Sequence, residues 1–114
     1  MKIAPLLAAL AATSFANPAQ AVLVDGYSAQ LAKLPEIRKR AVIRRAILDN
    51  EAACQQVTMV KLQGRWKNLT MWSARCTKGG DYGVFIGPDG TAQVRACTDI
   101  AKLKTLPACQ LPKP

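Results

Sequence analysis

The chain contains four cysteines, which all lie beyond residue 50: Cys54, Cys76, Cys97 and Cys109. An even number of cysteines in a short chain of an oxidising compartment predicts a disulfide framework. Three pairings are possible. We favour Cys54–Cys76 with Cys97–Cys109, because neighbours in a short meander usually lie side by side in space. The sequence has no Cys-x-x-Cys motif, which disfavours a structural zinc site and thioredoxin-type redox chemistry.

The N-terminus has the three parts of a secretory signal peptide. Lys2 supplies a positive charge, residues 3–12 form an apolar run, and residues 19–21 (Ala-Gln-Ala) form a small-x-small cleavage site. Because a transmembrane helix needs roughly 20 apolar residues, we expect residues 1–21 to be a cleaved signal. A buried N-terminal helix, or cleavage after Ala16, is a weaker alternative. The mature protein is therefore predicted to be periplasmic or secreted, without a transmembrane segment.

The mature chain is large enough for one domain. Removal of 21 of the 114 residues leaves 93, so we expect a single disulfide-stabilised domain over residues 22–114. A domain of this size buries only about 60–65% of the surface of its unfolded chain and is marginally stable. Two disulfides that close short loops would each stabilise it by about 3 kcal/mol.

A helix is predicted from residue 35 to residue 53. Pro35 suits the first turn of a helix, where its missing N–H is not needed, and the charge of Glu36 complements the helix dipole. One apolar stripe, within a sector of about 60°, is expected to face the core: Leu34, Ile37, Ala41, Leu48 and Ala52. Residues 22–33 show no clear period, and we expect them to be extended.

Beyond Cys54 the apolar period falls from 3.6 to 2, which predicts strands. The predicted strands cover residues 57–63, 68–76, 82–86 and 92–97. Residues 77–81 have turn composition. Residues 87–90 (Gly-Pro-Asp-Gly) are typical of a hairpin, with Gly90 free to adopt a left-handed conformation. Thr98 or Asp99 is predicted to cap a short helix that runs through Lys104.

These elements predict an α+β domain. We expect one N-terminal helix packed on a three- to four-stranded antiparallel meander, stapled by two disulfides, with one face of the sheet buried under the helix.

The composition offers little catalytic chemistry. The sequence contains no histidine, which removes the usual activation of serine and cysteine nucleophiles and the commonest metal ligand. Of the seven carboxylates, Asp81 and Asp89 lie in predicted turns, and none can be named for acid–base work. The glycine pairs join strand to strand and do not form phosphate-binding loops. We therefore expect no enzymatic activity, no catalytic residue, no metal and no cofactor, and we rank a small hydrolase last.

The predicted helix is strongly basic. Against Glu36, its basic residues are Lys33, Arg38, Lys39, Arg40, Arg44 and Arg45. The full chain has a net charge of +9, which falls to +8 when Lys2 is removed. Such a field attracts anionic partners, which outside the cytoplasm means anionic lipid or wall polymer, or an acidic protein, rather than nucleic acid. Solvation of the outer face of a packed helix is the simpler interpretation of these charges.

Three further residues are candidates for protein binding: Trp66, Pro88 and Asp89. Trp66 follows Gly64-Arg65 in a predicted turn, where an exposed tryptophan would mark a binding hot spot. Trp72, in the middle of a strand, is expected in the core.

A resemblance rests on residues 72–94. This segment reads Trp-Ser-Ala-Arg-Cys-Thr-x-Gly-Gly-x-Tyr-Gly-Val-Phe-Ile-x-x-Asp-Gly-x-x-x-Val and resembles small uncharacterised secreted proteins of proteobacteria. The order of helix, strands and Asp-Gly turn also looks like the PepSY domain of the bacterial envelope, over about half of the mature chain. A PepSY-like domain implies a non-catalytic module that binds or restrains a peptidase or another envelope protein.

Two functional hypotheses follow. The first is an exported, non-enzymatic binding or inhibitory module of the bacterial envelope, which uses the sheet edge or the loops near Trp66 and Pro88-Asp89. The second is a basic envelope-associated protein that binds anionic lipid or wall polymer through Arg38, Lys39, Arg40, Arg44 and Arg45. The sequence does not indicate an oligomeric state.

Overall fold

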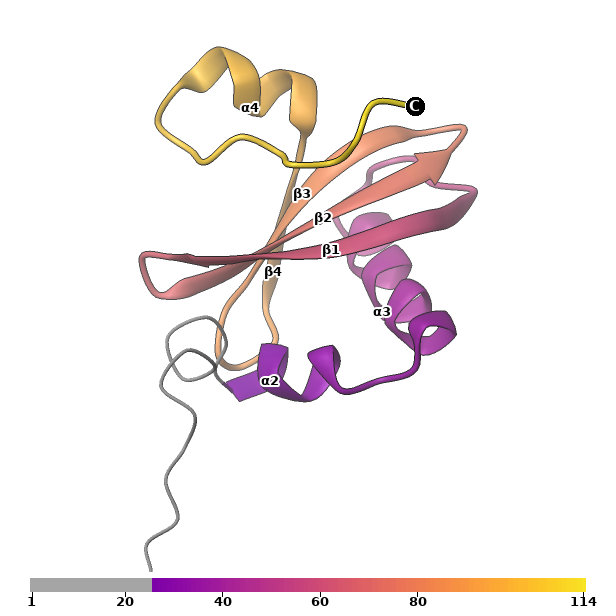
Figure 1. Cartoon of the computed structure of the whole chain (residues 1–114), viewed down its shortest axis with the longest axis vertical. Helices are drawn as coiled ribbons and strands as arrows, with labels where there is room; N and C mark the ends of the chain where they lie inside the picture. Colours follow the sequence, from indigo (N-terminus) through magenta and orange to yellow (C-terminus); the bar gives the residue numbers. More distant parts are fainter. Residues whose placement is uncertain (1–25) are drawn as a thin grey trace, which may run out of the picture.

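The computed structural model of the protein describes residues 26–114, so the predicted signal peptide, residues 1–21, lies outside the described residues. The described part contains helices and strands in a single α+β arrangement (Figure 1). In chain order the elements are α2 (Gly26–Ala32), α3 (Glu36–Asp49), β1 (Gln56–Trp66), β2 (Leu69–Thr77), β3 (Gly80–Ile86), β4 (Ala92–Ala96) and α4 (Cys97–Leu103).

The strands form the predicted meander. They pair antiparallel in the order β1-β2-β3-β4, so each strand lies beside its neighbours in the sequence. The hairpin turn between β3 and β4 has the expected chemistry: the amide of Gly90 donates to the carbonyl oxygen of Gly87 at 3.0 Å, and Gly90 has φ +93°. β1 is longer than predicted and continues through Gly64 to Trp66, with register shifts at two points against β2.

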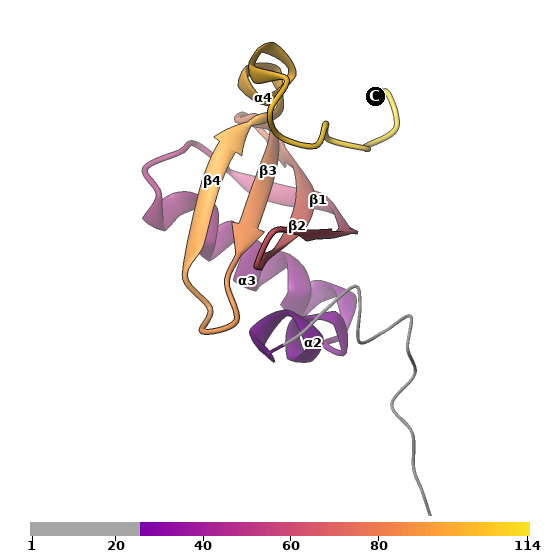
Figure 2. The same ribbon diagram turned by 90° about the vertical axis from the view of Figure 1, so that its left-hand side faces the viewer.

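Helices lie on both faces of the sheet (Figures 1 and 2). One face packs on α2 and α3 through a core that includes Trp72, Val84 and Ile86, and Trp72 is only 1% exposed, as expected. The other face packs on α4 through Met71, Phe85 and Ile100. The sequence predicted cover for one face, whereas the structure has a second, smaller core on the opposite face.

The prediction of which side of α3 faces the core is confirmed only in part: Leu34, Leu48 and Ala52 are half-buried and pack against the core. Ile43 and Ile47 are fully buried, whereas Ile37 is 78% exposed and Ala41 is also exposed. The helix carries aliphatic residues on more than one side, and the side with two isoleucines one turn apart removes more apolar surface from water than the side with Ile37 and Ala41. The stripe predicted to face inward therefore points partly outward.

The α3 helix is also shorter than predicted, because it ends at Asp49. The side-chain amide of Asn50 donates to the carbonyl oxygen of Ala46 at 2.8 Å, and Glu51 adopts a positive φ of 63°. A side chain that caps the last carbonyls, followed by a left-handed residue, ends a helix.

Residues 26–32 form helix α2, where the sequence predicted extended chain. The helix is only seven residues long, too short to show a period of its own. Tertiary contacts fix it instead: the indole N–H of Trp72 donates to the Ser28 hydroxyl at 3.1 Å, and both residues are buried. The amide of Tyr27 donates to the Pro88 carbonyl oxygen at 3.1 Å, which ties α2 to the β3–β4 hairpin.

Helix α4 begins at Cys97, with Ala96 in the N-cap position and no side-chain cap, so neither Thr98 nor Asp99 caps it as predicted. The helix packs closely on Gly83. A Cβ atom on Gly83 would lie 2.6 Å from Cδ1 of Ile100 and 3.2 Å from Cε of Met71, so a larger residue there would force these side chains to shift.

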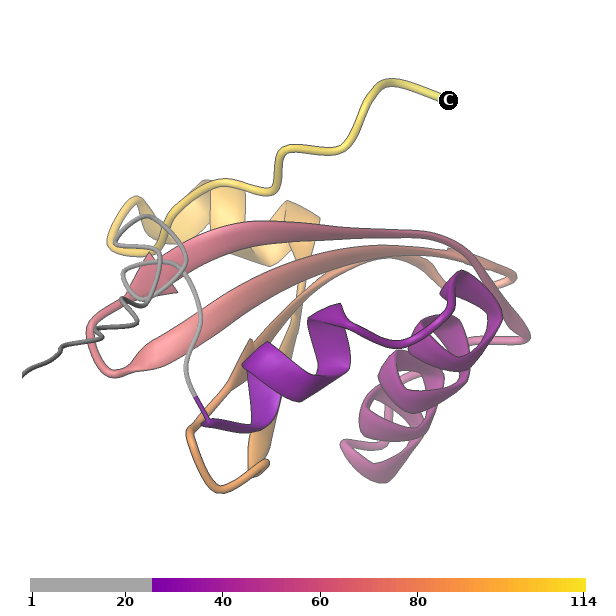
Figure 3. The same cartoon turned by 60° about the horizontal axis from the view of Figure 1, so that its bottom comes forward.

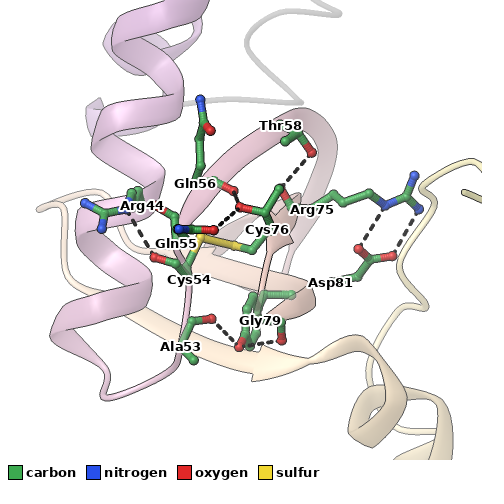
Figure 4. Close-up of a disulfide and its surroundings, with 12 residues drawn as sticks. Arg44, Ala53, Cys54, Gln55, Gln56, Thr58, Arg75, Cys76, Gly79 and Asp81 are labelled. Carbon is green, nitrogen blue, oxygen red and sulfur yellow. Dashed lines mark hydrogen bonds and ion pairs between the residues drawn. A yellow bond between two sulfur atoms is a disulfide. The ribbon is translucent and has the colours of Figure 1, made fainter.

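Both disulfides join the favoured partners. Cys54–Cys76 has a Cα–Cα distance of 5.2 Å and Cys97–Cys109 one of 5.8 Å. The first bridge ties the segment after α3 to the end of β2 and is almost completely buried. The second ties the start of α4 to the C-terminal tail. The hydroxyl of Tyr82 donates a hydrogen bond to the carbonyl oxygen of Ala53 at 2.7 Å, and Ala53 immediately precedes the bridge (Figure 4).

Candidate functional site

The basic residues of α3 do not form one free cationic patch. Glu36 pairs with Arg40 at 3.3 Å and with Lys39 at 3.9 Å, and these partners lie one turn apart on the helix surface. Arg38 is exposed. Exposed pairs of this kind contribute little stability, but they reduce the positive field that the helix presents.

Arg44 has a structural role. Its Nε donates to the carbonyl oxygens of Cys54 at 3.2 Å and Gln55 at 3.0 Å (Figure 4). These carbonyls belong to the segment that carries the buried disulfide, so Arg44 holds α3 against that segment. Arg45 lies further round the helix and forms an exposed pair with Asp49 at 3.8 Å.

Trp66 is not the exposed turn residue that the sequence predicted. It ends strand β1 and is half-buried. Its ring meets Phe85 edge to face, with centroids 5.7 Å apart, and the ammonium group of Lys67 lies 4.8 Å from its centroid. Both contacts stabilise an aromatic side chain in place. Trp66 therefore belongs to the smaller core, on the face that packs on α4.

Pro88 and Asp89 form the exposed tip of the β3–β4 hairpin. The Asp89 carboxylate accepts hydrogen bonds from the amide of Thr91 at 3.1 Å and from its hydroxyl at 2.8 Å. These bonds hold the pKa of the Asp89 carboxyl below its usual range, and the bond from the Thr91 amide contributes most. Asp89 thus acts within its own turn, as aspartate commonly does.

A groove of about 570 Å³ lies between α3 and the β3–β4 hairpin. Its apolar part comes from Val42 and Ala46 of α3, from Ile86 at the end of β3 and from Ala92 at the start of β4. Grooves of this size that combine apolar lining with a few polar groups are typical of binding sites.

Polar side chains complete the lining of the groove. They are Tyr27 of α2, Arg45 and Asp49 of α3, Asn50 just after α3, and Thr91 just before β4. Arg45 and Asp49 pair loosely and are well exposed, so a bound ligand can displace either side chain from the other. Of the residues predicted to bind a partner, Arg45 alone lines this groove, and Pro88-Asp89 lie beside it in the hairpin.

The groove runs beside the edge of the sheet. Among the described residues β4 pairs with β3 alone, and Figure 2 shows β4 at the margin of the sheet, with α3 behind it. An edge strand has unpaired main-chain donors and acceptors, which are a template for another extended chain. The combination of edge strand and groove is therefore suited to binding an extended segment of a protein.

Most residues of the groove were not predicted from the sequence. Tyr27, Asn50 and Thr91 come from three separate segments, and no local pattern links them. The predicted sheet edge was the one sequence signal that pointed toward this groove. The position of α3 beside that edge depends on long-range packing.

The described residues contain no group of three or more His, Cys, Asp or Glu side chains that could hold a metal ion. Over residues 26–114, no helix is both long enough and apolar enough to span a membrane. The chain matches no family model, no curated protein and no solved structure. The two disulfides are compatible with an extracellular or periplasmic protein.

Proposed function

We propose that this protein is an exported, non-enzymatic binding or inhibitory module of the bacterial envelope, in the periplasm or outside the cell. In this proposal, the module binds an extended segment of another envelope protein along β4. The observation that carries the proposal is the groove of about 570 Å³ beside the edge strand β4. The absence of histidine from the sequence supports a role without catalysis.

The binding mode is strand addition. The partner segment pairs with β4 through main-chain hydrogen bonds, and every second side chain points toward the groove. The small side chains of Ala46 and Ala92 leave room there for an apolar residue of the partner. Arg45 at the rim attracts an acidic group on the segment. The PepSY-like resemblance adds the class of partner: a peptidase, or another envelope protein, that the module restrains.

The test places a large side chain inside the groove and measures partner binding. Ala46→Phe places a bulky ring in the groove, whereas Ala41→Phe puts the same ring on the exposed side of the same helix. Both mature variants and the wild type are used to capture partners from a periplasmic extract. A bound protein is then identified by mass spectrometry, and its affinity is measured by calorimetry. We expect Ala46→Phe to weaken binding at least tenfold and Ala41→Phe to leave it unchanged.

Two results would contradict the proposal. One is a partner that binds the Ala46→Phe variant as tightly as it binds the wild type, while circular dichroism shows both to be folded. The other is repeated failure of the wild type to capture any partner in stoichiometric amount.

A second candidate function is electrostatic attachment to anionic lipid or wall polymer through α3. The observation that favours it is the outward position of Ile37 and Ala41, next to the exposed Arg38. An aliphatic side chain flanked by cations suits the boundary between head groups and acyl chains. Binding to vesicles with anionic lipid should fall steeply between low and physiological salt, and Ile37→Asp/Arg38→Glu should abolish it. Equal binding by this variant would eliminate the second candidate.

A further inference from the structure

The C-terminal tail lies across the face of the sheet that is opposite α3. In Figure 3 the tail follows β1 on one side of the sheet, while α3 lies on the other side. The disulfide of Cys109 fixes the start of this segment to Cys97. Beyond Cys109, polar side chains of β1 and β2 hold the tail.

Gln63 of β1 binds the tail at two points. Its side-chain nitrogen donates to the carbonyl oxygen of Ala108 at 2.9 Å, and its side-chain oxygen accepts from the amide of Gln110 at 2.9 Å. The hydroxyl of Ser73, on the neighbouring strand β2, donates to the same side-chain oxygen. The amide group of Gln63 is therefore oriented by the sheet and uses both its donor and its acceptor on the tail.

Two cations extend this row of contacts. Lys61 donates through Nζ to the carbonyl oxygen of Gln110 at 3.2 Å, and Arg75 donates to the carbonyl oxygen of Pro112. Asp81 orients the Arg75 guanidinium through two bonds of 3.0 and 3.1 Å. A bidentate pair of this kind fixes the direction in which the remaining N–H groups point.

These contacts bind main-chain atoms at regular intervals. The accepting carbonyls belong to residues 108, 110 and 112, which lie on one side of an extended chain. Proline fits position 112 because the contact uses its carbonyl and needs no N–H. A hollow of about 90 Å³, lined in part by Met71 and Pro107, lies beside the tail and can accept a further side chain.

We propose that Lys61, Gln63, Ser73 and Arg75 form a second binding surface, the tail cradle, for extended proline-containing segments of another protein. In this structure the tail cradle holds the chain's own residues 108–112. Because the cradle contacts the main chain, a partner segment with carbonyls at the spacing of residues 110 and 112 can replace the part of the tail beyond Cys109. The tail thereby competes with such a partner.

The part of the tail beyond Cys109 is suited to exchange. Gln110, Pro112, Lys113 and Pro114 are exposed, and Leu111 is half-buried. Hydrogen bonds at an exposed surface contribute little net stability, because water competes for the same groups. Residues 110–114 can therefore leave the cradle while the Cys97–Cys109 disulfide remains intact.

The test separates the tail from its cradle. A truncated protein that ends at Cys109 retains both disulfides and keeps Ala108 on Gln63. The probe is therefore a synthetic peptide of residues 110–114 with an acetylated N-terminus. Calorimetry or an NMR titration should show that the truncated protein binds this peptide at least tenfold more tightly than the full mature chain does. A peptide with a methylated Gln110 nitrogen should bind at least tenfold more weakly, because it lacks the donor to Gln63.

Matched variants locate the binding surface. In the truncated protein, Gln63→Leu should weaken peptide binding at least tenfold, and Gln93→Leu, an exposed glutamine on β4, should leave it unchanged. Ala46→Phe should also leave it unchanged, because the groove at β4 is a separate site.

Three results would overturn the tail cradle. They are a truncated protein that does not bind the peptide at millimolar concentration, equal binding by the full mature chain, and full binding by a folded Gln63→Leu variant.

Discussion

Removal of the buried disulfide should destabilise the domain more than most single contacts could. The bridge Cys54–Cys76 closes a loop with a sequence separation of 22 residues. In the chain-entropy model, release of such a loop increases the entropy of the unfolded chain and lowers the free energy of unfolding by about 3 kcal/mol. For a domain of this size that corresponds to a fall in melting temperature of roughly 12–24 °C.

The double variant Cys54→Ala/Cys76→Ala tests this value by thermal and urea unfolding of a chain that spans residues 22–114. The alanines also remove the sulfur atoms of two buried residues, which are 5% and 7% exposed, so packing losses add to the entropic term. A second measurement isolates the crosslink. In Cys97→Ala/Cys109→Ala, reduction breaks the Cys54–Cys76 bond but keeps both sulfur atoms.

The reduced second variant should still lose about 3 kcal/mol relative to its oxidised form. An oxidised and a reduced form that unfold within two or three degrees of each other, a margin of about 0.5 kcal/mol, would refute the reasoning. The segment after α3 would then be held by Arg44 and its carbonyl partners without help from the crosslink.

Three smaller perturbations follow from particular contacts. Gly83→Ala should lower the free energy of unfolding by about 1–3 kcal/mol. Ile100→Ala removes the clashing Cδ1, so it should cost less stability in the Gly83→Ala background than in the wild type, a coupling that a double-mutant cycle in urea measures. Ser28→Ala leaves the buried N–H of Trp72 without its partner and should lower the free energy of unfolding by about 1–3 kcal/mol, measured by urea unfolding. The lowered pKa of Asp89 should stabilise the folded state fully above the ordinary aspartate pKa of about 4. This stabilisation should disappear as the pH falls through the pKa of Asp89 in the folded protein. An NMR titration of the Asp89 carboxyl with a midpoint at or above about 4 would contradict this.

The sheet could be predicted from the sequence because its information is local. Alternation with period 2 located each strand, and the Gly-Pro-Asp-Gly segment located the hairpin between β3 and β4. Antiparallel strands that are joined by short turns have few possible orders in a sheet. The meander and the favoured disulfide pairing were therefore both predicted from the spacing of strands and turns. Trp72 in the core followed from its position in the middle of a strand.

The helices were less predictable because their faces depend on distant partners. The sequence of α3 carries aliphatic residues on two sides, and the sheet selected the side with Ile43 and Ile47. The seven residues of α2 have no visible period, and the contact between Ser28 and Trp72 holds them in place. Periodicity describes one element, whereas the choice between its faces is made by the apolar surface of another.

The candidate sites depend even more than the helices on long-range packing rather than on local sequence patterns. The sequence predicted a small α+β domain with a meander of three to four strands, two bridges and a basic helix, and the structure has these elements with four strands. Long-range packing, which the sequence pattern does not reveal, places α3 beside β4 around a groove and lays the tail over Gln63 and Arg75. Strands and turns form from short-range preferences, whereas a binding surface forms where segments far apart in the chain are brought together by burial of their shared core.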